Sequence, residues 1–373
     1  MATIQTKRLA SSKRFLLRLS IPAVLGAGAI GTAFVYPGVA SGSTPTLASS
    51  TPSAVLAMAL APTQKVYSAS VNETGNLGLP TTFLNSLGTS GSGGLSGLLT
   101  QALGGTVTAN FWTNHAGSAR VQFPSSTGEI DLYASPGSLW EWDYSTNTAT
   151  SITLPSSTTS SSTTSSTTAS SLTPAQLADA IISKLPQGST LSLGTAQYVA
   201  GEPAYTLVVN ANDPNSLIAS VSIAVDANSG NVLGVWVNAV GSTSAAFSSV
   251  DTTVSFVAPS SSVLSFTVPS GATVNTMTLP TGSSSTTSSG TTYTHTSYGS
   301  GFSTVEEITS SSGSLPTSNN TLLTSLLASG TPVTTAAGSG TLISTSVGSA
   351  FIGNNGVIAF GAVPSKVLLG DLG

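Results

Sequence analysis

The chain has 373 residues, no cysteine and only 6% charged residues, and its mean hydropathy is +0.30. Five of the nine Lys and Arg residues lie within the first 18 positions, whereas all thirteen Asp and Glu residues follow them. A chain this acidic beyond residue 18 offers no basic surface to nucleic acid or to anionic lipid headgroups. The lack of cysteine excludes disulfides, thiolate metal sites, a thiol nucleophile and anchoring through a lipid-modified cysteine.

Residues 1–43 have the three regions of a secretory signal peptide. Basic residues precede an apolar run from Ile21 to Ala40, and small residues follow it. This order predicts an exported, extracytoplasmic protein, in the cell envelope or secreted, with everything after residue 40 outside the cytoplasm. An uncleaved membrane anchor is the alternative, because the run is long for a signal core, although Gly26, Gly28, Gly31 and Pro37 interrupt it.

The chain after residue 43 begins with a short helix and continues as closely spaced strands. Thr51 is suited to cap a helix over 51–63, with Pro52 at its first position. Alternation of polar and apolar residues then predicts a strand within 65–80. Further strands are predicted at 106–114, 118–124, 128–135, 138–144 and 148–154. Together they indicate an antiparallel meander.

The last two of these strands form a predicted hairpin around the turn residues "STN". Strand periodicity separates an aromatic face from a face with two carboxylates: Trp140, Trp142 and Tyr144 against Leu139, Glu141 and Asp143. We expect the aromatic face to point into an apolar interior and the carboxylate face into water. The aromatic residues are then either plain core or the wall of a ligand cavity, and the same two interpretations apply to Trp112 and Trp236.

The second half of the predicted domain returns to strands after one helix. Residues 156–171 are all Ser or Thr except Ala169, which predicts a disordered loop. A helix over 173–186 follows, and its apolar stripe contains Leu177, Ile181 and Leu185. Strands are predicted at 189–201, 203–211, 219–241 with a turn at 228–230, 250–259 and 263–269. The fold class is therefore mainly β with short helices (α+β), an antiparallel sheet curled around an interior with helices on one side.

The C-terminal part of the chain predicts a separate small unit. The polar run at 281–301 is typical of a linker, which ends the first domain at 44–280. Residues 302–373 then combine strands and a helix in a small α+β module. A unit of this size buries little surface alone, so we expect it to dock on the first domain or on a partner.

Few residues of the chain are suited to catalysis or metal binding. The two histidines, His115 and His295, are far apart in the sequence, and no G-x-S-x-G motif occurs. The carboxylate pairs Glu141 with Asp143 and Glu306 with Glu307 are ordinary on a solvated surface. We therefore predict no enzyme activity, no metal and no cofactor.

The order of these elements resembles the LolA-like proteins, a group that includes periplasmic lipoprotein carriers and the sigma-factor regulators RseB and MucB. The segments that carry the resemblance are "SASVNETGNLGLP", "ARVQFPSSTGEIDLYASPGSLWEWDYSTNTATSITLP", "TPAQLADAIISKL", "VAGEPAYTLVVNANDPNSLIASVSIAVDANSGNVLGVWV" and "VSFVAPSSSVLSFTVPSGATV". They cover roughly residues 50–279 and are most similar to an actinobacterial branch. The long Ser/Thr loop and the missing lipid-anchor cysteine depart from the mycobacterial members.

The resemblance implies an unclosed antiparallel β-barrel whose mouth is closed by a helical lid, with an apolar cavity for acyl chains. On that view the candidate cavity residues are aromatic residues of the strands and apolar residues of the predicted lid helix: Trp112, Trp140, Trp142, Tyr144, Trp236, Leu177 and Ile181. A second module after such a domain also resembles the layout of RseB.

Three functions are consistent with these patterns. The first is an exported carrier that binds acyl lipid or the lipid part of a lipoprotein. The second is an RseB-like envelope-stress sensor that contacts a membrane-bound anti-sigma factor through residues 302–373. The third is a surface or wall structural protein in which the Ser/Thr-rich segments are spacers.

Overall fold

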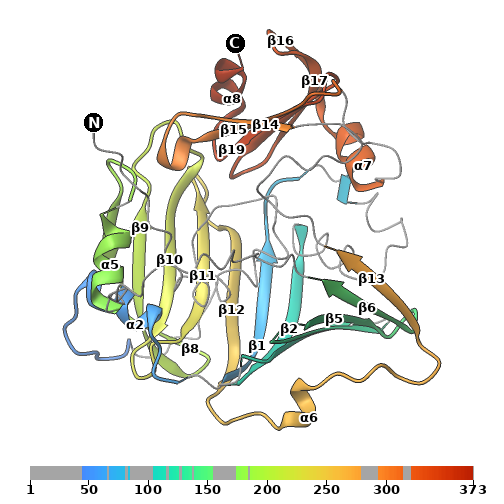
Figure 1. Ribbon diagram of the computed structural model, residues 1–373. Coiled ribbons are helices and arrows are strands. Elements are labelled where there is room, and N and C mark those ends of the chain that lie inside the picture. The colour runs from blue at the N-terminus through green and yellow to red at the C-terminus, as the bar shows by residue number, and fades with distance from the viewer. Residues whose placement is uncertain are drawn as a thin grey trace, which may run out of the picture.

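The computed structural model describes residues 44–64, 67–79, 83–84, 104–114, 117–125, 128–136, 138–153, 174–183, 185–278, 293–313 and 321–372. The predicted signal peptide, the Ser/Thr loop at 156–171, His115 and most of the predicted linker lie outside these residues. Within the described part the fold is mainly β, with two open sheets and a few short helices (Figure 1). None of the helices described is both long and apolar enough to cross a membrane.

The larger sheet has thirteen strands and consists of two meanders that meet at its centre. The first meander contains β1 (Tyr67–Gly75), β2 (Thr106–Thr113), β3 (Ala119–Ser125), β4 (Gly128–Ser135), β5 (Ser138–Asp143) and β6 (Thr148–Thr153). The second contains β7 (Thr190–Leu193), β8 (Gln197–Val199), β9 (Glu202–Asn210), β10 (Ile218–Asp226), β11 (Val232–Ala239) and β12 (Ala245–Ser255). Antiparallel pairing of β1 with β12 joins the two meanders into one curved sheet.

A crossing segment returns the chain from the centre of this sheet to its edge. After β12 the chain passes through helix α6 (Ser261–Leu264) and adds β13 (Thr273–Thr278) parallel to β6. The ring of Phe266 lies on the aromatic face of the predicted hairpin, with its centroid 5.0 Å from Tyr133, 5.5 Å from Trp140 and 6.1 Å from Trp142. The strand predicted at 263–269 was therefore wrong, because these residues cross over the sheet instead of pairing with it.

Two helices lie on one face of the second meander. Helix α2 (Pro52–Leu60) is capped by Thr51, as predicted, and the Thr51 side chain accepts a hydrogen bond from the Ala54 backbone N–H. Helix α5 (Pro174–Ile182) packs on α2, and Ser53 donates a 2.6 Å hydrogen bond to Asp179 between them. The buried residues of this layer are Val55, Leu56, Ala59, Ala178, Leu207 and Val225.

The turn between β10 and β11 holds the C-terminal end of α2 against the sheet. Asp226 accepts hydrogen bonds from the backbone N–H groups of Asn228 and Ser229 at 3.2 and 3.0 Å. Gly230 adopts φ +76°, and a Cβ atom there would lie 2.6 Å from the Met58 carbonyl oxygen. The glycine is thus required both by the turn and by the close approach of the helix.

The smaller sheet is six-stranded and lies at one end of the larger one (Figure 1). Its order is β14 (Tyr293–Tyr298), β15 (Val305–Ser310), β19 (Val357–Gly361), β18 (Ser349–Gly353), β17 (Gly338–Ser344) and β16 (Thr331–Thr335). A 3-10 turn η1 (Gly301–Ser303) and helices α7 (Thr321–Ser329) and α8 (Ser365–Asp371) complete it. Residues 293–298 were expected to belong to a linker, but their alternating sequence pairs with β15.

The two sheets are connected by hydrogen bonds as well as by apolar packing. The Ser346 backbone N–H donates to the Leu77 carbonyl at 2.7 Å, and the Leu217 N–H donates to the Ala362 carbonyl at 2.8 Å. Val347, in the turn between β17 and β18, is buried against Val237, Ala239 and Ala246 of the larger sheet and against Leu77, which follows β1. The smaller sheet therefore packs against the larger one.

We predict that Phe266→Ala destabilises the protein by roughly 2–3 kcal/mol, because the large ring packs against three aromatic side chains of β4 and β5. Chemical unfolding followed by tryptophan fluorescence measures the change. The matched control is Val257→Ala in the same crossing segment, where the side chain is 74% exposed and we expect a change within about 0.5 kcal/mol. Equal effects of the two substitutions would show that the crossing segment does not pack on the hairpin.

Candidate functional site

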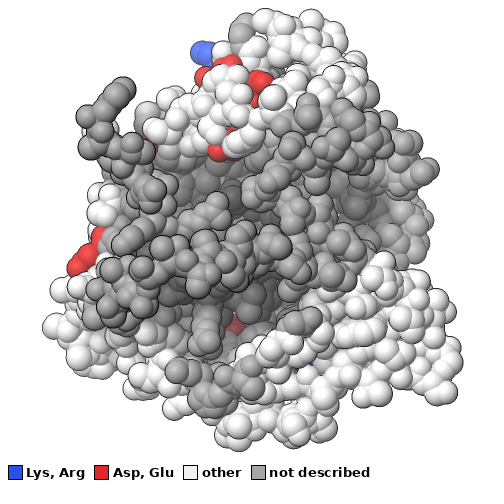
Figure 2. Space-filling view, viewed as in Figure 1, with Lys and Arg blue, Asp and Glu red and all other residues white. Residues whose placement is uncertain are grey.

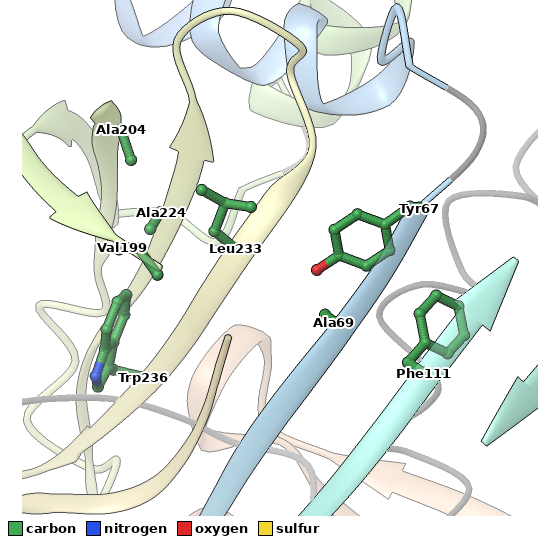
Figure 3. Close-up of a cluster of buried hydrophobic side chains, with 8 residues drawn as sticks. All are labelled: Tyr67, Ala69, Phe111, Val199, Ala204, Ala224, Leu233 and Trp236. Carbon is green, nitrogen blue, oxygen red and sulfur yellow. The ribbon is translucent and has the colours of Figure 1, made fainter. Parts of the chain in front are cut away.

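The candidate site is an apolar pocket on one face of the larger sheet, where the two meanders meet. It is lined by residues of β1, β2, β3, β11 and β12 and of the turn before β11: Tyr67, Val71, Glu73, Ala109, Phe111, Val121, Phe123, Asn231, Val232, Leu233, Gly234, Val235, Ser249 and Asp251. Figure 3 shows Tyr67 and Phe111 side by side on neighbouring strands, with Leu233 across from them on β11. The ring centroids of Tyr67 and Phe111 are 5.7 Å apart.

The alternation of β1 explains why one carboxylate faces this pocket. Tyr67, Ala69, Val71 and Glu73 share a face because successive side chains of a strand point to opposite sides. Glu73 pairs with Val107 on β2 and with Ser249 on β12. An apolar strand face thus carries one carboxyl group into the interior.

A β-bulge brings a second carboxylate to the same face. Ser70 pairs with Thr253, but the next residue, Val71, pairs with Asp251, so that Thr252 is the extra residue in β12. Without the bulge, Thr252 would lie opposite Val71 and Asp251 would face the other side of the sheet. The bulge therefore places Asp251 beside Ser249 and diagonal to Glu73 on the pocket face.

Glu73 is buried and only partly satisfied. Its side chain is 2% exposed, and its Oε1 atom accepts a 3.4 Å hydrogen bond from the Ser249 hydroxyl. The other oxygen, Oε2, has no hydrogen-bond partner. Burial raises the pKa of Glu73 to about 7, because the charged form loses its hydration, and the Ser249 hydrogen bond offsets only part of this effect.

Asp251 is buried in the same way. It is 7% exposed and accepts a hydrogen bond from the Tyr67 hydroxyl. Burial raises its pKa to about 8. The lining of the pocket includes no Lys, Arg or His, so both acids are mainly protonated below pH 7 and the pocket is then uncharged.

The pocket is small for a ligand site. Its volume is about 90 Å³, which is enough for a few water molecules and well below the ~300–1,000 Å³ of pockets that enclose a drug-sized ligand. Charged side chains are also sparse over the described part of the face shown in Figure 2. Among the described residues, no three His, Asp or Glu side chains gather in a way that could hold a metal ion.

The aromatic residues predicted for a cavity lie elsewhere. Trp140 and Trp142 pack under Phe266 on the opposite face of the sheet. Tyr144 is 52% exposed and contacts the edge of Trp142. Trp112 lies 5.2 Å from the guanidinium of Arg120. These side chains therefore form packing contacts of the first meander and do not line the pocket.

The remaining predicted cavity residues are divided between two other places. Trp236 is buried against Val199 (Figure 3) and lines a second, more open pocket together with Gln197 and Val250. Ile181 is half-buried against α2 and β9. The side chain of Leu177 lies outside the described residues. The structure does not bring the seven predicted residues together at one site.

The expected carboxylate face of the hairpin also needs correction. Asp143 is 7% exposed rather than in water, because it accepts hydrogen bonds from the Ser145 N–H and hydroxyl at 2.8 and 2.6 Å and so fixes the turn. In the smaller sheet, Glu306 pairs with His295 at 2.7 Å, and Glu307 accepts a hydrogen bond from Tyr298 at 3.1 Å. None of these acids lies in the pocket.

Sequence reasoning missed Glu73 and Asp251. The signal for Glu73 was present, since continuing the alternation of Tyr67, Ala69 and Val71 by one step puts this residue on the apolar face. Asp251 gave no comparable signal, because its orientation depends on the bulge at Thr252.

No protein-family model and no curated protein matches the chain. Among solved structures, MucB in complex with MucA(peri) is similar at 15% identity and a TM-score of 0.39, over 84% of this chain and 93% of that chain. The complex of MucA and MucB from Pseudomonas aeruginosa gives 15% identity and a TM-score of 0.41, over 85% of this chain and 95% of that chain. A LolA superfamily protein from Nitrosomonas europaea gives 10% identity and a TM-score of 0.23, over 58% of this chain and 99% of that chain.

These solved structures include MucB and a LolA superfamily protein, which are members of the group that the sequence resembles. With identities of at most 15% and TM-scores of at most 0.41, the similarities assign neither a ligand nor a partner to this chain.

The buried acids predict how stability depends on pH. Because the pKa of Glu73 is higher in the folded protein than in the unfolded chain, the folded state binds more protons between about pH 4 and its folded pKa of about 7, and Asp251 extends this window to about 8. Their contribution to stability is thus fully present below pH 4 and is lost as the pH rises through 7 and 8.

We expect Glu73→Gln to stabilise the protein relative to wild type at about pH 9 by on the order of 3 kcal/mol, since each pKa unit corresponds to ~1.4 kcal/mol, and to have little effect at about pH 4. Urea unfolding at both pH values measures the difference. The matched control is Glu202→Gln, a partly exposed residue of β9 outside the pocket. A stabilisation by Glu73→Gln that is equal at the two pH values would contradict the assignment.

Proposed function

We propose that this protein binds the acyl chain of a lipid or lipoprotein in the pocket between β1, β2, β3, β11 and β12. The observation that carries the proposal is an apolar pocket on one face of an unclosed sheet, in which even the two acids are uncharged below about pH 7. Such a surface has no charge with which to bind an ionic ligand. Binding of an apolar ligand is favourable there, because it removes apolar groups of the ligand and of the pocket from water.

The expected gain from burying an acyl chain is large enough for binding without a covalent bond. Each methylene contributes ~0.8 kcal/mol, so that a dozen buried methylenes contribute roughly 10 kcal/mol before the costs of association. The volume of an acyl chain of that length is larger than the volume of the pocket, which is about 90 Å³. The acyl chain fits only when the walls of the pocket move apart.

The helices α2 and α5 are the elements that we propose to move. Val232 lines the pocket and also contacts the apolar layer under the two helices. A shift of α2 would therefore change the pocket at its β11 side. Hydrogen bonds from Thr63 to Ser229 hold the end of α2 in place, with the Thr63 N–H donating at 2.8 Å.

We propose an extracytoplasmic location on the basis of the N-terminal sequence. If residues 1–43 direct export as predicted, an acyl-binding protein there would act as a carrier of lipid or lipoprotein in the envelope. The roles as envelope-stress sensor and as structural protein stay predictions from the sequence.

We expect the chain from residue 44 onward, purified from its own host's envelope, to carry acyl lipid in a one-to-one ratio in native mass spectrometry. Substitution Ala109→Leu fills part of the pocket, because Ala109 is 5% exposed and lines it. It should displace two or three methylenes and weaken binding of methyl laurate about 10- to 100-fold.

The control for this substitution is Ala350→Leu on β18, which adds the same side chain outside the pocket and should leave the affinity unchanged. A clean apo mass of the wild type, together with no binding of methyl laurate, would overturn the proposed function.

A further inference from the structure

We infer that Glu73 forms a recognition site for an uncharged carbonyl group of the ligand, the ester or amide at the head of an acyl chain, to which its protonated carboxyl group donates a hydrogen bond. This inference rests on the proposed function and names the polar part of the ligand.

The first support is the way in which the two oxygens of Glu73 are used. The Ser249 hydroxyl donates to Oε1, which therefore acts as the acceptor oxygen of the carboxyl group. The proton of the neutral acid then lies on Oε2, which has no partner although the side chain is 2% exposed. A buried O–H donor without an acceptor is unfavourable, and a carbonyl oxygen from the ligand would satisfy it.

The second support is the position of this group. Glu73 lines the pocket together with Val71, Ala109, Phe123 and Val235, so that its free oxygen lies next to the proposed path of the acyl chain. One polar group in an apolar pocket fixes the orientation of a ligand, because only one part of the ligand can satisfy it.

The charged and titratable groups around Glu73 favour a neutral ligand over a charged one. From β1 and β12 the titratable residues that line the pocket are Tyr67 and Asp251, whereas β2, β3 and β11 contribute none. A ligand carboxylate would find no cation there. An ammonium group would require at least one acid to ionise inside the apolar pocket.

Protonation then controls binding. Only the protonated form of Glu73 can donate, and ionisation of either acid would place an uncompensated charge beside the acyl chain. The pKa of about 7 for Glu73 and about 8 for Asp251 set the range in which the ligand is released as the pH rises. Release at higher pH is the opposite of what an ammonium ligand would show.

The test measures the affinity of the chain from residue 44 onward for methyl laurate by native mass spectrometry and calorimetry, at about pH 5.5 and about pH 9. We expect the dissociation constant of the wild type to be at least about 10-fold larger at the higher pH, with the loss beginning near the pKa of Glu73. Circular dichroism at both pH values monitors folding.

Three variants separate the contributions of the two acids. Glu73→Gln keeps a neutral donor at all pH values, so that binding should persist past the pKa of Glu73 and weaken only near that of Asp251. The double variant Glu73→Gln with Asp251→Asn should bind equally at both pH values. Glu73→Leu removes the donor and should bind about 10-fold more weakly than Glu73→Gln at the lower pH.

The outcomes distinguish the inference from the proposed function. Binding of methyl laurate that is independent of pH in the wild type and unchanged in Glu73→Leu would overturn the inference and leave the acyl pocket standing. Tighter binding of laurylamine at the higher pH would also overturn it, because the site would then be a cation site. No binding of methyl laurate at either pH would overturn both.

Discussion

The pairing of β1 with β12 is the interaction on which the rest of the structure depends. These strands come from opposite ends of the first domain, and their ladder joins two meanders that otherwise contact little of each other. The same ladder positions the candidate site, because it sets Glu73 opposite Ser249 and, through the bulge, Asp251 opposite Val71. Fold and site therefore share one set of hydrogen bonds, and a slip of β1 by one residue relative to β12 would put Glu73 and Asp251 on opposite faces of the sheet.

The two acids differ from the other buried carboxylates that the structure describes. Asp131 accepts hydrogen bonds from Arg120 at 2.8 and 3.1 Å, and Asp226 accepts from the backbone of its own turn. Those groups are compensated, whereas Glu73 has one weak partner and one free oxygen. A protein that keeps Glu73 only partly hydrogen-bonded at the centre of its sheet gives up stability near neutral pH, and a binding role explains why.

The sequence predicted the architecture better than the site. Local alternation and turn residues are visible in a strand such as β5 or in the cap at Thr51, so most strands and the helices were located correctly. The crossing by Phe266, the inclusion of 293–298 in a sheet and the bulge at Thr252 depend on contacts between distant segments. Aromatic residues suggested a cavity because they are large and apolar, and Trp140 and Trp142 pack against Phe266 of the crossing segment.

The most direct test of this account is an NMR titration of the side-chain carboxyl carbons, assigned with the Glu73→Gln and Asp251→Asn variants. We expect these two resonances to titrate near pH 7 and pH 8 in the folded protein. Titration of both groups at the ordinary value of about 4 would contradict it, because the pocket would then contain charged, hydrated acids at neutral pH.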